Sequence, residues 1–386
     1  MTETVHAFLT TPMVFHGPGA LSKLPELLRR LGSRNPVIVT DPGLVEAGIL
    51  AQVAGTLNQE TPAFTDVRPE PPDTLVAQCT DFLRSHNADL VIGLGGGSAI
   101  DVGKIAAVML GNTGQVSDYW GVEKVPNPGV PFVAIPTTAG TGSEVTPAAV
   151  FSDTATHTKK GVRSSVLQPT GAILDPLLTL SVPPAVTAAT GVDALTHAIE
   201  AYTSTACTVL NEFFAERAVS LIGRHLKTAF DNGSSVEARE GMLMGSYLAG
   251  LSFAIANVAA VHAIAQTIGG QYPVPHGVAN AVMLPFVMEF NRSHCAAKYA
   301  RLGELLGIAP EADVQASAAA AVSAVRDLTR SVAIPQSLRE LGIAEERLPD
   351  LAKLCVETQG RLLVLNPREA TAPDIEAILR QAYAGN

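Results

Sequence analysis

Four side chains with metal-binding chemistry lie in two segments that are far apart in the sequence. Asp193 and His197 are four residues apart in the helical pattern 191–202, so they face the same side of that helix. His262 lies in an apolar helical pattern, and His276 ends a loop of glycines and prolines. Three imidazoles and one carboxylate can hold Zn²⁺ or Fe²⁺ and leave positions open for a substrate oxygen. The plainer alternatives are buried core histidines and a surface Asp–His pair.

A run of small residues follows the apolar segment 88–94 and leads into a helical pattern. It consists of Gly95, Gly96, Gly97 and Ser98. Glycines let the backbone turn sharply and approach another group closely, and a helix N-terminus favours an anion. Because Ser98 fills the place of the third glycine, the run differs from the usual GxGxxG pattern. It predicts phosphate binding, and the alternative is a tight turn that has no ligand.

Two further polar segments follow apolar runs. Asp41 comes directly after residues 36–40, where a carboxylate can accept from both hydroxyls of a ribose and repel a 2′-phosphate, so it favours NAD over NADP. A turn at this aspartate is the alternative. The loop 135–146 offers hydroxyl groups to a second phosphate or ribose from Thr137, Thr138 and Thr141. An ordinary polar loop is the alternative there.

The elements that must position these residues differ between the two parts of the chain. Before residue 180, short apolar runs typical of buried parallel strands alternate with helical patterns at 19–31 and 74–86; the runs are 36–40, 88–94, 131–135 and 171–174. After Pro184 the patterns are helical, at 192–202, 212–230, 236–256, 296–306, 316–332 and 373–384. We therefore expect an α/β domain over residues 1–182, a helical domain over 183–386, and a ligand cleft between them.

Composition limits the class of protein. Of 386 residues, 47% are hydrophobic and 16% are charged, which supplies a sizeable core. The net charge of −10 and the lack of a basic run argue against nucleic-acid and anionic-membrane binding. Four scattered cysteines and the lack of an export signal predict a cytoplasmic protein.

Taken in order, the glycine run, the 136–146 loop, the Asp-x3-His helix and the His-x13-His-Gly segment resemble the iron-containing (group III) alcohol dehydrogenase family. The resemblance extends from Val14 to about Ala300. It implies the dehydroquinate synthase-like fold, with a Rossmann-like α/β N-terminal domain, an all-helical C-terminal domain, and NAD(P) and a metal in the cleft. The implied metal ligands are Asp193, His197, His262 and His276. The implied cofactor contacts are Asp41 as the NAD-selecting aspartate, Gly95, Gly96, Gly97, Ser98, Thr137, Thr138, Thr141 and Lys160.

The chain departs from the family pattern at two places. Many members have a further histidine one helical turn after the third ligand, on a proton path, and this chain has Gln266 there. Glutamine forms hydrogen bonds but does not carry a proton at neutral pH. Some members have a polar residue where this chain has Ala148. With Phe151 and Phe253 expected nearby, the substrate pocket is predicted to be small and apolar.

These observations predict an NAD-dependent, metal-assisted oxidoreductase that interconverts a small alcohol and its aldehyde or ketone. Iron is the implied metal and zinc is the alternative, because histidine and carboxylate ligands suit both. A homo-oligomer, dimeric or larger, is expected. Two other functions stay open: a dehydroquinate synthase-like lyase acting on a phosphorylated substrate, and a non-catalytic oligomer. The lyase needs a basic pocket, and the motifs have few cations nearby beyond Lys160, Arg163 and Arg292.

Overall fold

The computed structural model describes residues 7–156 and 158–385. Six strands in the first half of the chain form a parallel sheet in the order β1-β9-β6-β4-β2-β3. In that order the strands are Val14–His16, Gly171–Leu174, Phe132–Pro136, Leu90–Gly95, Pro36–Val39 and Ala63–Phe64. The four predicted strands are confirmed within two residues at each end. The short strands β1 and β3 were not predicted, because three and two residues are too few to show a period.

Alternate residues of the sheet are buried against two layers of helix, so the strands are apolar throughout. Val37 and Val39 pack with α4 (Thr74–Ser85) and α5 (Gly97–Met109). Ile38 packs on the opposite face, against α1 and α3. Helices on this opposite side and at the strand ends are α1 (Leu24–Arg30), α2 (Pro42–Glu46), α3 (Ile49–Ala54) and the 3₁₀ helices Ala20–Lys23 and Pro176–Thr179.

A second, three-stranded sheet, two strands of which follow the 136–146 loop, was not predicted. β7 (Ala148–Asp153) and β8 (Thr158–Arg163) pair antiparallel, and β5 (Gly121–Val122) adds to β8. The 3₁₀ helices Val116–Tyr119 and Ser165–Leu167 flank it. The sequence of β8 is mostly polar, which hides it from a search for apolar runs.

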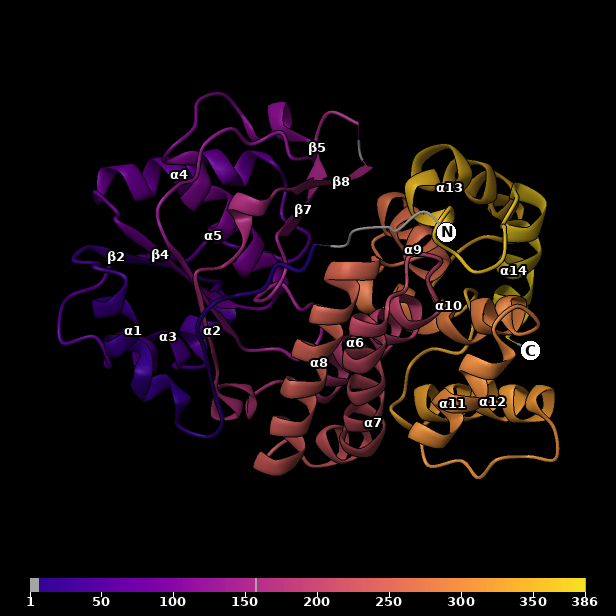
Figure 1. Cartoon of the computed structure of the whole chain (residues 1–386). Helices are drawn as coiled ribbons and strands as arrows, with labels where there is room; N and C mark the ends of the chain where they lie inside the picture. Colours follow the sequence, from indigo (N-terminus) through magenta and orange to yellow (C-terminus); the bar gives the residue numbers. More distant parts are fainter. Residues whose placement is uncertain (1–6, 157, 386) are drawn as a thin grey trace.

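From Pro184 onward, the described chain forms helices only (Figure 1). They are α6 (Pro184–Thr203), α7 (Val209–Asp231), α8 (Val236–Ala256), α9 (Ala260–Gln271), α10 (His276–Asn291), α11 (Ala296–Leu305), α12 (Val314–Ser331), α13 (Leu348–Leu363), α14 (Ala372–Ala384) and the 3₁₀ helix Glu345–Arg347. One apolar core joins them, and α6 and α9 contribute fully buried residues to it. The predicted helices are confirmed, although α6 begins earlier than expected and neither α10 nor α13 was predicted.

Helices α8 and α9 are both largely apolar. Among the described residues, no single helix has the length and apolar character needed to cross a bilayer. Only α8 and α9 taken together reach that length and composition, and a bend of 100° separates them.

Candidate metal centre and nucleotide-binding edge

Three of the four predicted metal ligands converge where α6, α9 and α10 meet. Asp193 lies on α6, His262 in the first turn of α9, and His276 is the first residue of α10. One ligand atom from each lies within 4.8 Å of the others. The Nε2 atoms of His262 and His276 are 3.7 and 3.9 Å from Oδ1 of Asp193. These separations exceed a hydrogen bond, so the three groups surround a point without bonding to one another.

His262 is held through one ring nitrogen only. Its Nδ1 is 2.5 Å from Oε2 of Glu200, which lies two helical turns after Asp193 on α6. Its Nε2 is buried and has no hydrogen-bond partner within the described part of the chain. A buried polar atom without a partner is rare in folded proteins and requires an explanation. A metal ion bound by the Nε2 lone pair supplies one.

The fourth predicted ligand, His197, lies beside this group rather than within it. Its ring stacks on those of His262 and Phe253, with centroids 4.6 and 4.4 Å away. Its Nδ1 is 3.2 Å from the carbonyl oxygen of Gly140, a residue of the 136–146 loop. Burial lowers the pKa of His197 to about 3, so the ring is neutral at pH 7 and can act as a ligand.

Asp193 and His276 share a neighbour, Asn280, that sequence analysis missed. Its Nδ2 is 2.6 Å from Oδ1 of Asp193 and 3.0 Å from Nε2 of His276. Burial alone would raise the pKa of Asp193, but the three histidines and the Asn280 amide lower it below its ordinary value. Burial also lowers the pKa of His276. The lowered pKa values favour an ionised Asp193 and neutral rings at His197 and His276, which are the forms that bind a metal.

The charge of this cluster fits a divalent cation. Asp193 and Glu200 are both buried, and within the described ranges neither forms an ion pair with a lysine or arginine. Buried carboxylates are normally paired or coordinate metals. The side chain of His276 is 35% exposed, whereas those of Asp193 and His262 are at most 4% exposed. The cluster is therefore reached from the His276 side.

The predicted nucleotide-binding residues gather at the carboxyl edge of the six-stranded sheet. Gly95 ends β4 with φ of +149°, and a Cβ there would lie 2.7 Å from Cβ of Ala99. The same Cβ would lie 3.3 Å from Oδ2 of Asp41, so Asp41 is next to the glycine run. Oδ1 of Asp41 accepts the N–H of Leu44 and caps α2. Asp41 thus forms the turn that was the local alternative, and it also lies beside the glycine run, where the cofactor is predicted to bind.

The 136–146 loop lies against the glycine run. The N–H of Thr137 donates to the carbonyl of Gly95 at 3.0 Å. A Cβ on Gly97 would lie 2.7 Å from Cγ2 of Thr141, and a Cβ on Gly96 would lie 3.3 Å from Oγ1 of Thr138. Half-exposed Ser98 is in the first turn of α5. The two loops therefore form one surface, with α5 starting behind it, as an anion site requires.

A buried lysine fastens the second loop to α5. Nζ of Lys104 donates to the carbonyls of Ser143, Thr146 and Ala148 at 2.7–2.9 Å. Burial lowers the pKa of Lys104 to about 8 and raises the pKa of nearby Glu144 to about 7. Two ionisable side chains that are buried away from water thus lie beneath the glycine run and the 136–146 loop.

Strand alternation in the β7–β8 hairpin places the remaining predicted residues on two opposite faces: Phe151 and Lys160 on one, and Ala148 on the other. Phe151 is fully buried, packs in the sheet core, and has its ring centroid 6.2 Å from that of Trp120. Lys160, opposite Phe151 in register, pairs with Asp153. The expectation that Phe151 lines the pocket is therefore corrected: strand alternation turns it into the core.

The other face of the hairpin is directed toward the helices. Ala148 and Lys159 lie on it, and Lys159 contacts Ser152 and Glu70. Glu70 raises and Lys159 lowers the pKa of His276, so of the two adjacent lysines it is Lys159 whose charge acts on the cluster.

Two helical residues complete the surroundings. Phe253 of α8 stacks on His197 and, through its Cε1, would contact a Cβ on Gly142 at 3.2 Å. Gln266 is half-buried on α9, one turn after His262.

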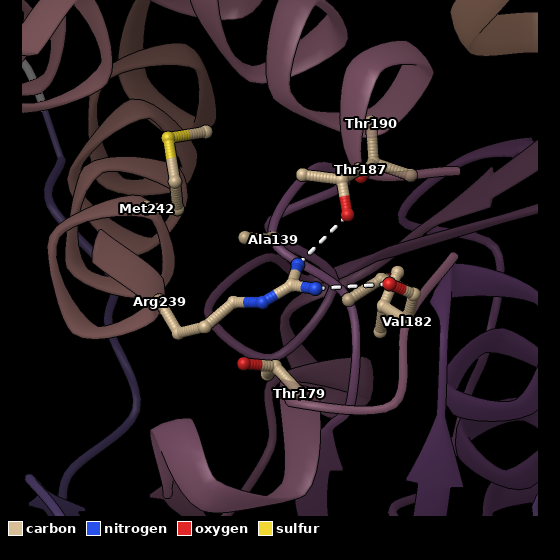
Figure 2. Close-up of a pocket in the computed structure, with 8 residues that line it drawn as sticks. Ala139, Thr179, Val182, Thr187, Thr190, Arg239 and Met242 are labelled. Atoms are coloured by element: carbon tan, nitrogen blue, oxygen red, sulfur yellow. Dashed lines mark hydrogen bonds between the residues drawn. The ribbon is translucent and has the colours of Figure 1, made fainter. Parts of the chain in front are cut away.

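A small cavity lies where the 136–146 loop meets the start of the helical region (Figure 2). It is lined by Thr138, Ala139, Thr179, Val182, Thr187, Thr190, Arg239 and Met242. Arg239 donates to Thr187 and to the carbonyl of Val182 there, at 2.7 and 2.9 Å.

Comparison with known proteins agrees with this geometry. The family described as "Iron-containing alcohol dehydrogenase" matches residues 11–176, and "Fe-containing alcohol dehydrogenase family, C-terminal" matches residues 187–383. The chain belongs to the iron-containing alcohol dehydrogenase family. It is 44% identical to long-chain-alcohol dehydrogenase 1 of Geobacillus thermodenitrificans, over 97% of this chain and 96% of the relative. It is 37% identical to the NAD-dependent methanol dehydrogenase of Bacillus methanolicus, over 97% and 99%.

Solved structures of the family share the fold. A 1,3-propanediol oxidoreductase superposes with a TM-score of 0.95 at 38% identity, covering 98% of this chain and all of the other. Sulfoacetaldehyde reductase from Bifidobacterium kashiwanohense, in complex with NAD⁺, superposes with a TM-score of 0.90 at 28% identity, covering 99% and 100%. The dehydroquinate synthase-like fold is thereby confirmed. The chain is an enzyme, an alcohol–aldehyde oxidoreductase, which decides against the lyase and the non-catalytic alternatives.

Within this family member, three residues near the site were missed by sequence analysis. Glu200 carried a usable signal, because it follows Asp193 by seven residues and His197 by three on one helix face. Asn280 follows His276 by four residues and carried the same kind of signal. Lys159 could be found only by knowing the alternation of β8, since two adjacent lysines give no preference.

Proposed function

We propose that the chain is an NAD(H)-dependent enzyme that interconverts a small alcohol and its aldehyde or ketone at one divalent metal. Asp193, His197, His262 and His276 would hold the metal, with iron as the family's ion and zinc as the alternative. The observation that carries the proposal is the buried, unpartnered Nε2 of His262, which is directed at Asp193 and His276.

The cofactor groove is proposed to run along the carboxyl edge of the sheet. The backbone N–H groups of the glycine run and the start of α5 would receive the pyrophosphate. Asp41 would accept from the ribose hydroxyls and select NAD. The hydroxyls of the second loop would line the remaining groove. The residues assigned to these roles are Asp41, Gly95, Gly96, Gly97, Ser98, Thr137, Thr138 and Thr141, with Lys160 kept as a weaker assignment because it pairs with Asp153.

When bound, the metal supplies a Lewis acid and the nicotinamide supplies hydride chemistry. The protein's own residues align the two. The carbonyl of Gly140, in the loop beside the glycine run, accepts from Nδ1 of His197 and so connects the groove to the metal cluster. Phe253 shields His197 from water, and Gln266 would order a proton path by hydrogen bonding rather than by titrating.

We propose three further properties of the chain together with this function: its substrate pocket, its division into two domains, and its assembly and location. The pocket beside Ala148 and Phe253 would admit a small, largely apolar alcohol or aldehyde. The chain is proposed to divide near residue 182, since strands precede this position and helices follow it. A cytoplasmic homo-oligomer, dimeric or larger, is proposed with neither nucleic-acid nor membrane partners.

Activity after metal exchange tests the proposal. The protein is stripped with a chelator, divided, and reloaded with Fe²⁺ without oxygen, with Zn²⁺, or with buffer. NADH absorbance is then followed with NAD⁺ or NADP⁺ and a series of short primary alcohols. We expect turnover with NAD⁺ only after a metal is returned. Full activity of the stripped protein, or inactivity with every metal, cofactor and alcohol, would overturn it.

A further inference from the structure

Helix α6 carries two buried carboxylates that act on opposite ends of one imidazole. Asp193 and Glu200 are seven residues apart, which is about two turns along the same helix face. The ring of His262 lies between them, with Nε2 3.7 Å from Asp193 and Nδ1 2.5 Å from Glu200. A contact of 2.5 Å requires a proton between nitrogen and oxygen, so Nδ1 donates to the carboxylate.

The position of Glu200 is fixed by a second bond. Its Oε1 accepts the backbone N–H of Val261 at 2.6 Å, in the first turn of α9. Glu200 is only 4% exposed, so these two contacts with α9, rather than water, satisfy its oxygens. Each oxygen therefore has its own donor, and both donors come from adjacent residues of α9.

We propose that Glu200 is a positioning residue that holds His262 in the tautomer able to bind the divalent metal. With the proton held on Nδ1, the lone pair of Nε2 faces Asp193 and His276. The carboxylate also adds electron density to the ring and so strengthens its bond to a cation. The inference rests on the proposed metal site and adds to it the residue that prepares a ligand.

Glutamine at this position cannot do the same work. Its amide has one oxygen and one NH₂ group, whereas the two donors on α9 need two acceptors. If the oxygen keeps the N–H of Val261, the NH₂ group faces Nδ1, and the His262 proton moves to Nε2, where it blocks the metal. If the oxygen turns to His262, a buried N–H on Val261 loses its partner. Either arrangement weakens the site.

Metal affinity of Glu200→Gln is the first test. Zn²⁺ is titrated into stripped protein in competition with a chromophoric chelator, well below the unfolding temperature. We expect binding about 10- to 100-fold weaker than in the wild type. Glu216→Gln, which removes a partly exposed carboxylate on α7, is the matched control and should bind as the wild type does. Equal affinity in Glu200→Gln and the wild type, with the fold intact by circular dichroism, would overturn the proposal.

The tautomer is measured independently of any variant's stability. Nitrogen-15 NMR of metal-free wild type, labelled at histidine and assigned against His262→Gln, should show Nδ1 protonated and Nε2 bare. A proton on Nε2 would overturn the proposal even if Glu200→Gln fails to fold. The two proposals can fail separately. If the wild type binds no metal, the proposed function is wrong. If the wild type binds metal but His262 has the other tautomer, only the role of Glu200 is wrong.

Discussion

The proposed nucleotide-binding edge depends mainly on backbone shape, whereas the proposed metal centre depends on side chains. A Cβ on Gly97 would lie 2.7 Å from Thr141 of the 136–146 loop, so the two loops approach closely only because this Cβ is missing. At the metal centre, side chains from α6, α9 and α10 decide, and the backbone only spaces them. The edge is therefore a surface formed by two loops, and the metal centre is a cluster of side chains from three helices. They meet at Gly140, whose carbonyl accepts from His197.

Removing one metal ligand should separate the two sites most strongly. His262→Ala is expected to lower kcat/KM by about a thousandfold or more, because a Lewis acid contributes several kcal/mol. NADH binding, followed by fluorescence, should change less than about threefold. A parallel loss of NADH affinity would show that the two sites are one cooperative unit.

The charged groups beneath the loops give a prediction about pH. The raised pKa of Glu144, about 7 against an ordinary 4.5, means that its ionisation in the folded protein removes stability as pH rises from 4.5 through 7. Relative to wild type, Glu144→Gln should therefore gain about 3 kcal/mol in unfolding free energy across that range. Urea titrations of both proteins at several pH values measure this gain. Glu357→Gln, at an exposed position on α13, should track the wild type.

Adding one methyl group at Gly97 tests whether nucleotide binding at the edge depends on the close approach of the two loops. Gly97→Ala places a Cβ 2.7 Å from Thr141 and should push the two loops apart. We expect NAD⁺ affinity to fall about thirtyfold, roughly 2 kcal/mol, with metal content unchanged. Gly360→Ala, where no atom lies within 4 Å, is the control. Unchanged NAD⁺ binding in Gly97→Ala would contradict the assigned role of the glycine run.

Cofactor choice is a smaller effect at the same edge. Because Asp41 also caps α2, Asp41→Asn is a better test than glycine, since asparagine keeps the acceptor and removes only the charge. The ratio of kcat/KM for NADP to that for NAD should rise about tenfold. A wild type that uses both cofactors equally well would rule out selection by Asp41.

The smallest effect is expected near the metal centre at Gln266. Gln266→His should add an ionisation near neutral pH to the rate profile and change kcat by less than about tenfold. Gln266→Ala should lower kcat modestly. If metal and cofactor are bound and the profile of Gln266→His is unchanged, Gln266 only packs the helix.

The same contrast explains what could be predicted from the sequence. The glycine run and its strand are contiguous, so one short segment was enough to predict the turn and to suggest a phosphate ligand. The proposed metal ligands are scattered, so their residue types only suggested a shared site, and the family resemblance was needed to assign them to it. The helical spacing of Glu200 and Asn280 placed them on the same helix faces as Asp193 and His276, but it did not show which groups they contact, because that depends on how α9 and α10 pack on α6. Phe151 was misplaced because an unrecognised hairpin set the face to which it points.

The sheet order has a consequence for synthesis on the ribosome. Val14 of β1 pairs with Ala172 of β9, and Asp175 accepts from the N–H groups of Gly19 and Leu21. β1 therefore cannot pair with β9 until nearly the whole α/β half has been translated. Until β9 arrives, the outer edge of β6 stays open in the nascent chain, and an open parallel edge invites pairing with other chains. Messages truncated shortly before the codons for 171–174 should accordingly yield aggregates, whereas those ending beyond Asp175 should release a sheet with both β1 and β9 in place.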